Sequence, residues 1–415
     1  MRIAVIGSGI SGLVAARELS DLHEVTVFEA DSRPGGHTHT VDVEDSLGRP
    51  HKVDTGFMVC NERNYPGLFH IFRNLGVALK PTDMSFSVRC EQTGIEWNGH
   101  SVNQIFSQRR NLLRPSFHGM IKDIIRFQEK AKALAEGDAD DITVESFVEQ
   151  MGLGQRFLNH YLIPLGSSLW SSPPADFLRF SMRFLARFLH NHGMLSWSGR
   201  PQWMTVVGGS SAYLEPLMAP FRARVHLSTP VQQVRRHETG VTLKLPRDEA
   251  TFDEVILACH ADQARAMISD LDPGEDEILS AIRFQRNDVV LHSDTSLLPR
   301  RRRAWASWNY CVPLDRPEQA TVTYNMNFLQ GLESASTFCV SLNSQDRISP
   351  QHVLKRFEYH HPIFSLGAEQ AKLRHRDLIR KRRTSFCGAY FGQGFHEDGV
   401  QSALRVAEAF QVGSP

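Results

Sequence analysis

Residues 2–12 read Arg-Ile-Ala-Val-Ile-Gly-Ser-Gly-Ile-Ser-Gly, an apolar run that ends in the pattern G-x-G-x-x-G. Good helix formers follow over residues 13–19, and a second apolar run over residues 24–28 ends on Glu29. Strand, glycine turn, helix, strand and acid in this order are the layout of a dinucleotide-binding βαβ unit. Because the flanking elements and the acid are all in place, nucleotide binding is favoured over an ordinary glycine-rich turn.

The three glycines of this pattern have separate tasks. Gly7 permits the tight turn, Gly9 lets backbone N–H groups approach a pyrophosphate, and Gly12 lets the helix pack closely against the strand. The N-terminus of the helix carries about half a positive charge, which favours a phosphate group. Glu29 stands where an acid accepts hydrogen bonds from a ribose hydroxyl.

The bulk composition bounds the class of protein. A chain of 415 residues is long enough for two domains, or for one large domain with an insertion. Lys and Arg together number 46, as do Asp and Glu, so net charge provides no general attraction to nucleic acid. No apolar run approaches the ~20 residues of a membrane span, and the first strand starts at residue 2. We therefore expect a cytoplasmic protein without a signal peptide.

The six cysteines are widely scattered and contain no C-x-x-C pair. This usage is typical of reduced thiols and argues against a disulfide framework or a zinc site. His37 and His39 could be imagined as metal ligands, but no cluster of carboxylates or thiols supports them. We expect no metal.

A second glycine pair follows soon after the acid, in Ala30-Asp-Ser-Arg-Pro-Gly-Gly-His-Thr38. A loop of this kind suits a backbone that folds back over the same pyrophosphate, with Arg33 near its charge. G-S-G-I-S-G followed by E-A-x-x-R-P-G-G-H-T resembles the flavin-containing amine oxidase and phytoene desaturase superfamily. The resemblance implies that the cofactor is FAD and that His37 belongs to the second glycine loop.

Later segments extend the resemblance over nearly the whole chain. G-G-S at residues 208–210, T-P-V at 229–231 and D-E-V-I-L-A-C-H at 253–260 are similar to the segments with which the superfamily returns to its nucleotide domain. There the backbone at the position of Val231 contacts adenine. G-A-Y-x-G-x-G-F-H-E-D-G at 388–399 resembles a bacterial subgroup of predicted NAD/FAD-binding oxidoreductases that is associated with fatty acyl modification.

The resemblance implies an α/β fold of two parts. One is a FAD-binding, doubly wound, Rossmann-like domain that is discontinuous in sequence, and the other is a mixed α+β substrate domain. We expect residues 1–80, 201–270 and 376–415 in the first. Residues 81–200, with a helical insert, and 271–375, with a sheet, would form the second. Local patterns predict a helix over 66–79, a hairpin over 85–97, strands over 225–231 and 320–325, and a last helix over 400–410.

One set of cofactor-binding residues follows from the motifs and the resemblance. It combines the two glycine loops, the flavin-proximal residues after the D-x-G of residues 54–56, the adenine-side valine and the C-terminal glycine segment. We expect noncovalent FAD, because the local pattern of a cysteinyl–flavin bond is missing although Cys387 is nearby. The set is Gly7, Gly9, Ile10, Ser11, Gly12, Glu29, Ala30, Arg33, Gly35, Gly36, His37, Thr38, Gly56, Phe57, Met58, Val231, Gly388, His396, Glu397, Asp398, Gly399 and Val400.

The C-terminal segment also carries the candidate catalytic residue, His396. An imidazole can carry protons near neutral pH, but a hydrogen-bonded structural histidine fits the sequence equally well. In the superfamily the last helix points its N-terminus at the flavin, so we expect N–H groups near Val400 to stabilise negative charge there. Asp398 is expected at the ribityl or phosphate region of the cofactor.

Two basic or aromatic patterns have alternative interpretations. Phe177–His192 is predicted as one helix, with stripes of Phe and Arg at every fourth residue. Core packing is favoured for the Phe stripe and a solvated face for the Arg stripe. The alternative is a helix that borders an apolar channel or lies on a bilayer surface. The four arginines of 300–303 are interpreted as a solvated loop, with peripheral contact to acidic lipid headgroups at a membrane surface as the alternative.

Three functions remain open from the sequence. The first is a FAD-dependent oxidoreductase that takes a hydride from a small apolar or lipid substrate, as a desaturase or isomerase does, with no electron acceptor specified. The second is a flavin amine or amino-acid oxidase, which is disfavoured because no lysine lies between Ser280 and Trp308, where amine oxidases place one against flavin N5. The third is a non-catalytic FAD-binding accessory protein.

Overall fold

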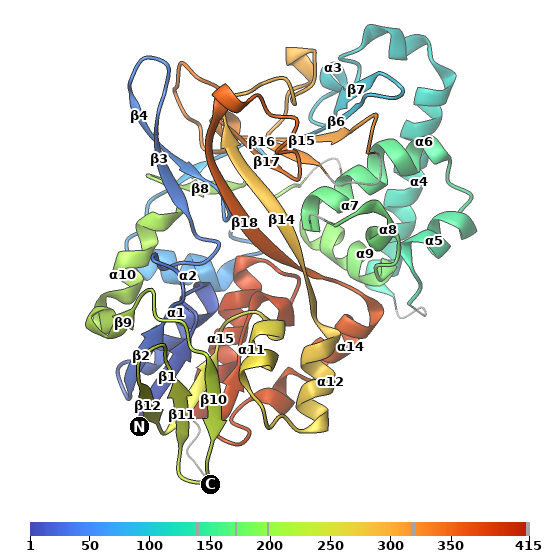
Figure 1. Cartoon of the computed structure of the whole chain (residues 1–415). Coiled ribbons are helices and arrows are strands. Elements are labelled where there is room, and N and C mark those ends of the chain that lie inside the picture. Colours follow the sequence, from blue (N-terminus) through green and yellow to red (C-terminus); the bar gives the residue numbers. More distant parts are fainter. Residues whose placement is uncertain (138–140, 171, 197–198, 317–320, 412–415) are drawn as a thin grey trace.

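The computed structural model describes residues 1–137, 141–170, 172–196, 199–316 and 321–411. Two sheets dominate it, a parallel sheet near the chain termini and a larger mixed sheet at the other end (Figure 1). A long antiparallel pair of strands runs from the larger sheet towards the parallel one, and a bundle of helices flanks the larger sheet. A predicted strand over 320–325 begins at a residue outside the described ranges.

The parallel sheet has the order β19-β13-β1-β2-β9. Its strands come from three separate stretches of the chain, which agrees with a discontinuous doubly wound domain. Successive residues of the first strand point to opposite faces, so Ile3 and Val5 join one core while Ala4 and Ile6 join another. The strands are β1 (Arg2–Ile6), β2 (Glu24–Phe28), β9 (Val225–His226), β13 (Glu254–Leu257) and β19 (Thr384–Phe386).

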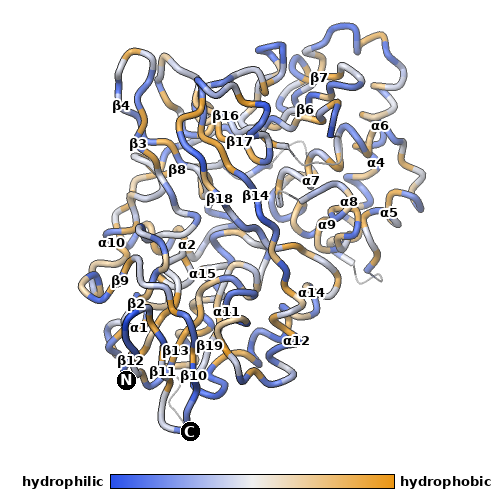
Figure 2. The backbone as a smooth tube through the Cα atoms, in the orientation of Figure 1, coloured by the Kyte–Doolittle hydropathy of each residue, from blue (hydrophilic) through white to orange (hydrophobic). Residues whose placement is uncertain are grey.

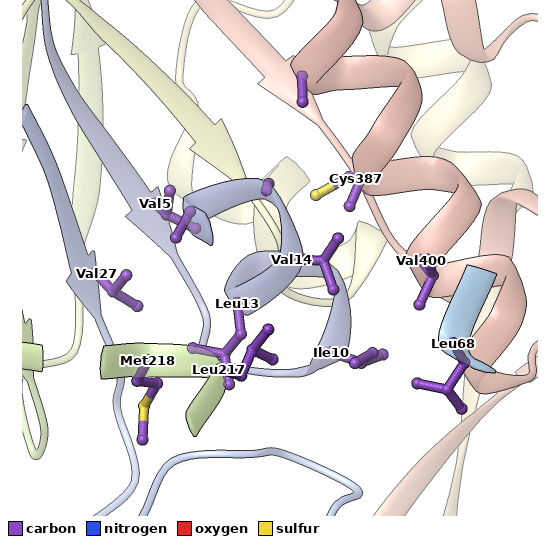
Figure 3. Packing of buried hydrophobic residues seen from close by; sticks show 14 of the residues in the cluster. Val5, Ile10, Leu13, Val14, Val27, Leu68, Leu217, Met218, Cys387 and Val400 are labelled. Carbon is purple, nitrogen blue, oxygen red and sulfur yellow. The ribbon is translucent and has the colours of Figure 1, made fainter. Parts of the chain in front are cut away.

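Helices cover one face of this sheet, and Figure 3 shows the core beneath them. There Val5 and Val27 of the sheet, Leu13 and Val14 of the first helix, and Val400 of the last helix belong to one buried cluster. Both faces of the strands are buried, and their sequences are therefore nearly continuous apolar runs. The helices are α1 (Ile10–Leu19), α2 (Pro66–Asn74), α10 (Leu214–Met218) and α15 (His396–Gln411).

The other face is covered by a small antiparallel sheet and further helices. Figure 2 shows hydrophobic stretches on the inner strands and a hydrophilic stretch along the outer strand β10. These elements are β10 (Gln233–Arg236), β11 (Val241–Lys244), β12 (Glu249–Phe252), α11 (Ala261–Met267), α12 (Pro273–Ala281) and α14 (Leu366–Leu373).

The larger sheet has the order β18-β14-β17-β16-β15-β6-β7. The predicted hairpin near residues 85–97 is present as β6 and β7, which pair antiparallel. The members are β6 (Phe86–Cys90), β7 (Ile95–Asn98), β14 (Arg283–His292), β15 (Trp308–Val312), β16 (Val322–Asn325), β17 (Cys339–Leu342) and β18 (Val353–Ile363). Two strand pairs and a short helix complete this region: β3 (Thr40–Glu44) with β4 (Pro50–Asp54), β5 (Leu79–Pro81) with β8 (Met204–Val206), and α13 (Met326–Leu329).

The helical insert corrects one prediction. Phe177–His192 forms two helices rather than one, because the Ser181 hydroxyl accepts the N–H of Phe184 at 2.9 Å and caps a new helix. Phe184 and Phe188 are buried in the core of the insert while Arg187 is exposed, so core packing of the Phe stripe is confirmed. The insert contains α3 (Val102–Ile105), α4 (Pro115–Glu136), α5 (Val144–Gln150), α6 (Gln155–Phe157), α7 (Ile163–Trp170), α8 (Pro174–Leu178) and α9 (Met182–Asn191).

Three other predicted boundaries were wrong. The predicted strand over 225–231 ends at His226, because Ser228 adopts a φ of 50° that a strand does not allow. The predicted helix over 66–79 ends at Asn74, and Gly76 follows with a φ of 67°. The last helix begins at His396, four residues before the predicted start at Val400.

The described residues contain no helix with the length and apolar character that a membrane crossing requires.

A buried ion pair joins the small sheet to α12 and gives a stability prediction. Arg236 and Glu275 lie 2.8 Å apart with side chains 2% and 0% exposed. We expect Glu275→Gln to lower the free energy of unfolding by about 3 kcal/mol, because it removes one partner of a buried pair. Asp276→Asn, on the same helix as Glu275, breaks an exposed pair with Arg265 of α11 and should leave the midpoint of thermal unfolding nearly unchanged. Equal losses in the two variants would contradict the prediction.

Candidate functional site

The three glycines of the first loop differ in their surroundings, since two pack against other backbone and one borders open space. A Cβ on Gly7 would lie 2.8 Å from the carbonyl oxygen of Ala258, and one on Gly12 would overlap the carbonyl of Gly7. A Cβ on Gly9 would meet no heavy atom within 4 Å. Gly9 is also the N-cap of α1, and no side chain caps the first N–H groups of that helix. The N-terminus of α1 therefore faces open space, and an uncapped N-terminus of this kind fits the diphosphate of a dinucleotide.

The acid at the end of β2 points back to this loop. One carboxylate oxygen of Glu29 accepts the backbone N–H of Ser8 at 2.9 Å and the Ser8 hydroxyl at 2.5 Å. The other accepts the N–H of Asp31 at 2.9 Å, and Ala30 between them is exposed. The backbone N–H of Thr229 donates to the carbonyl of Glu29 at 2.8 Å, which brings the segment of Val231 to the same place. The contacts of these residues with ribose and adenine stay predictions.

The second glycine loop lies directly against the first. Gly35 and Gly36 adopt φ values of 108° and 57°, and a Cβ on Gly36 would lie 3.2 Å from the Cα of Gly9. The N–H of Gly35 donates to the carbonyl of Ser8 at 3.0 Å. Arg33 donates to the carbonyl of Thr38 at 3.3 Å. The two loops predicted to enclose one pyrophosphate are thus neighbours.

The residues predicted near the flavin also come together from distant segments. The N–H of Phe57 donates to the carbonyl of His37 at 2.8 Å, and Gly56 packs so tightly on that carbonyl that a Cβ would overlap it. The Phe57 ring stacks on His396 at 3.8 Å between centroids. The carbonyl of Met58 accepts the Thr205 hydroxyl at 2.9 Å. One wall of the site therefore combines the second glycine loop, the D-x-G segment and the start of α15.

His396 is a buried, neutral side chain at this wall. Its Nε2 shares a hydrogen bond of 3.0 Å with the hydroxyl of Thr38, which also bonds to the Tyr213 hydroxyl. Burial lowers the pKa of His396 to about 3. The imidazole is therefore neutral at pH 7 and is a weak base. Its role as a proton carrier stays a prediction.

The start of α15 approaches the start of α1. A Cβ on Gly399 would lie 2.8 Å from both Ile10 Cγ2 and Ser11 Oγ, so glycine is needed for this contact. Because α15 begins at His396, Val400 lies in its second turn, where backbone N–H groups bond within the helix. The N–H groups in a position to stabilise negative charge are those of the first turn, not the predicted ones near Val400.

The two acids of this turn have structural partners. Glu397 accepts the N–H groups of Gly67 and Leu68, each at 2.9 Å, and so caps the N-terminus of α2. Asp398 accepts the N–H of Phe395 at 2.9 Å, and burial raises its pKa to about 6. Upstream, the N–H of Gly388 donates to the Ser402 hydroxyl at 3.0 Å. Contacts of Glu397, Asp398 and Gly388 with the cofactor stay predictions.

The structure adds residues that the sequence did not single out. Asp54 accepts the Thr40 hydroxyl at 2.6 Å and the N–H of Ser210 at 2.8 Å, and burial raises its pKa to about 6. The Tyr359 hydroxyl lies 2.8 Å from both His39 Nδ1 and the Thr55 hydroxyl. The polar run of 358–361 inside a strand was the signal that could have identified Tyr359.

A surface hollow of about 480 Å³ opens beside the start of α15. It lies between the N-terminal turns of α2 and α15 and the C-terminal end of α9. Among the described residues, no three His, Cys, Asp or Glu side chains come together as metal ligands. The hollow is lined by Arg63, Asn64, Tyr65, Pro66, Asn191, His192, Gln393, Phe395, Glu397, Asp398 and Gln401.

The open space at Gly9 gives a direct test of the cofactor position. Gly9→Ala should leave the folded chain intact, since its Cβ meets no atom and its φ of −66° suits alanine. It should weaken FAD binding by about tenfold or more, because the Cβ enters the space of the diphosphate. The measurements are the FAD dissociation constant and the unfolding midpoint of the apoprotein. Gly119→Ala, which also enters open space but on α4, is the matched control. Unchanged FAD affinity in Gly9→Ala would show that the diphosphate lies elsewhere.

Solved structures share the fold over the whole chain. Cyclohexylamine oxidase from Brevibacterium oxydans matches with a TM-score of 0.70 and 17% identity, covering 99% of both chains. Putrescine oxidase bound to putrescine matches at 0.71 with 15% identity over 100% of both chains. A fatty acid isomerase of P. acnes that produces CLA matches at 0.68 with 15% identity over 99% of both chains. At these identities the likeness concerns the fold, and it confirms the predicted fold class.

Sequence comparison identifies the family. AofH of Mycobacterium tuberculosis, named as a flavin-containing monoamine oxidase, is 27% identical over 274 residues, which are 62% of this chain and 56% of that protein. The chain thus spans about half the length of the curated relatives it matches. The family model of flavin-containing amine oxidoreductases matches residues 10–284. The chain therefore belongs to the flavin-containing amine oxidoreductase family, and its cofactor is FAD.

Proposed function

We propose that this chain is a FAD-dependent oxidoreductase that removes a hydride from an apolar substrate, a fatty acyl or other lipid chain. FAD, when bound, supplies the hydride acceptor. The glycine loops, Glu29 and the first turn of α15 would hold it. The contribution of the protein is to orient a C–H bond, to exclude water and to receive a proton.

The substrate class is inferred from the two carboxylates that line the hollow, because both are already hydrogen-bonded within the protein. Glu397 already accepts the N–H groups of Gly67 and Leu68, together with the side-chain amide of Gln401 at 2.7 Å. Asp398 is committed to the N–H of Phe395. A buried ammonium needs a carboxylate partner. Both acids that line the hollow are used in holding its walls, which favours a substrate without positive charge.

The other walls support the same class. Phe395 stacks on Phe188 of α9 at 5.1 Å, and this contact joins the hollow to the aromatic core of the insert. His192 is buried, and burial lowers its pKa to about 4, so it too is neutral at pH 7. Arg63 is exposed on the rim. Apolar contacts in the hollow come from Tyr65, Pro66 and Phe395, among polar side chains, and Arg63 would pair with the carboxylate or phosphate end of an acyl chain.

Amine oxidation is the second candidate, and the names of the relatives favour it. AofH and several proteins of the same fold are named as amine oxidases. The half-buried Lys372, which pairs with Glu369, donates to the carbonyl of Gly392 at 2.8 Å, next to Gln393 of the hollow. Lys372 is on α14, outside the stretch from Ser280 to Trp308.

Anaerobic reduction of the bound flavin separates the two candidates. We expect long-chain fatty acids or acyl lipids to bleach the flavin absorbance, and cyclohexylamine or putrescine to leave it unchanged. Arg63→Gln should raise the acyl-chain concentration needed for half-maximal reduction about tenfold, by loss of a charge-assisted contact. Arg73→Gln, which removes an exposed arginine of α2 that pairs with Glu62, is the matched control. Bleaching by amines alone would overturn the proposal.

The role of His396 is tested at the same step. Burial lowers the pKa of His396 to about 3, so the ring is neutral throughout pH 5–9. It should therefore add no inflection to the pH dependence of the rate of flavin reduction in that range. We expect His396→Gln, which keeps a hydrogen bond to Thr38, to slow reduction by less than the ~100-fold that loss of a general base causes. A loss of 100-fold or more with FAD still bound would make His396 the proton carrier.

A further inference from the structure

Three histidines from distant segments gather beside the glycine loops: His37, His260 and His361. We propose that this histidine cluster binds the diphosphate of FAD and takes up protons as the cofactor binds. The inference rests on FAD as the cofactor and does not depend on the substrate proposed above.

Two of the three histidines are placed at the diphosphate site by the backbone. His37 directly follows Gly36, whose Cβ would lie 3.2 Å from the Cα of Gly9. His260 follows β13, the neighbour of β1, and it is the N-cap of α11. The Gly7 turn packs against Ala258 of this same segment. Ligands of open α/β sheets bind outside the carboxyl ends of the strands, where both histidines stand.

The third histidine reaches this place on the long strand pair. His361 lies on β18 near its end, and its ring centroid is 5.3 Å from that of His37. The side-chain amide of Asn287 on β14 contacts its Nδ1 at 3.2 Å. His360, the preceding residue, has its ring centroid 5.8 Å from that of His260. The strand pair therefore connects His37 with the start of α11.

The cluster has an unused hydrogen-bonding atom. Nε2 of His37 is buried and has no hydrogen-bond partner among the described residues. A buried polar atom without a partner is costly, and native structures satisfy such atoms with protein, water or ligand. An oxygen of a bound diphosphate would satisfy this one.

The positive charge of the glycine loops does not balance the negative charge of the diphosphate. The diphosphate of FAD carries two negative charges, and the helix end of α1 offers about half a positive charge. Arg33 is the single Lys or Arg of residues 7–12 and 33–38, and its Nε lies 3.6 Å from Asp31. Even with the full charge of Arg33 counted, about half a negative charge would be left, and uncompensated charge is unfavourable in a buried site. Protonation of the adjacent imidazoles supplies the balancing positive charge.

All three rings are neutral before the cofactor binds. Burial lowers the pKa of His260 and of His361 to about 4 and holds that of His37 well below its usual value. His37 also faces Arg33 of its own loop and His396 of α15, both of which oppose its protonation. His361 faces His260 and His360, and His260 faces His360 and, on α11, Asp262. Asp262 is the neighbour that favours the charged form of His260.

The consequence is FAD affinity that rises as the pH falls. A phosphate charge raises the pKa of each nearby imidazole, so the cofactor-bound form holds more protons than the free form. The gain in affinity is present below the raised pKa and is lost as the pH increases through it. One proton taken up corresponds to about a tenfold change in the dissociation constant for each pH unit.

The test uses the full-chain holoenzyme at low concentration. FAD released on dilution is measured by its fluorescence between pH 8 and pH 6, and the proton uptake on rebinding is counted by calorimetry in buffers of different ionisation enthalpy. We expect the dissociation constant to fall about tenfold per pH unit over at least part of this range, with about one proton taken up. His260→Gln and His361→Gln should reduce both the slope and the proton count.

His160→Gln is the matched control. His160 is also buried with a pKa lowered to about 4, but it lies in the helical insert and contacts the Thr93 hydroxyl at 2.9 Å. This variant should keep the slope of the wild-type protein. A dissociation constant independent of pH, with no proton uptake by the wild-type protein, would overturn the inference even if both variants failed to fold. Absence of FAD at every pH would overturn the inference and the cofactor assignment together, whereas failure of the lipid substrate alone would leave it standing.

Discussion

The approach of two helix N-termini is the constraint on which the rest of the structure depends. Gly399 lets the first turn of α15 contact Ile10 and Ser11 in the first turn of α1. Each N-terminus carries about half a positive charge. Carboxylates already stand beside both, because Glu29 accepts the N–H of Ser8 next to α1, and Asp398 in the first turn of α15 accepts the N–H of Phe395. The two helix ends therefore converge on one place, which is where a diphosphate would bind.

The strands that lead to this place come from three stretches of the chain and lie side by side in one sheet. The strands β1, β13 and β19 are neighbours, and the loop or helix after each one reaches the same edge of the sheet. The first brings the glycine loop, the second brings His260, and the third leads to the start of α15. Strands β14 and β18 then carry residues of the larger sheet to this edge, where Tyr359 meets His39 and Thr55.

Features that depend on neighbours in sequence could be predicted, and features that depend on distant contacts could not. The glycine loops and Glu29 follow from local patterns, and in the structure they lie together, with Glu29 bonded to Ser8. Their contacts with the cofactor stay predictions. The true start of α15 depends on Asp398 accepting the N–H of Phe395, and the break before α9 depends on the hydroxyl of Ser181. The pairing of His37 with His361 joins residues more than 300 positions apart, and no local pattern indicates it.

Burial has the same effect on the histidines beside the glycine loops and on those beside the hollow. Burial lowers the pKa values of His396, His192 and the histidine cluster and leaves these rings neutral at pH 7. At the diphosphate end the ligand is an anion, and the nearby imidazoles can respond by protonation. At the substrate end the carboxylates are already bound to backbone N–H groups and cannot respond to a cation. The two ends of the site therefore differ: neutral imidazoles stand beside the glycine loops, and carboxylates bound to backbone N–H groups stand at the hollow.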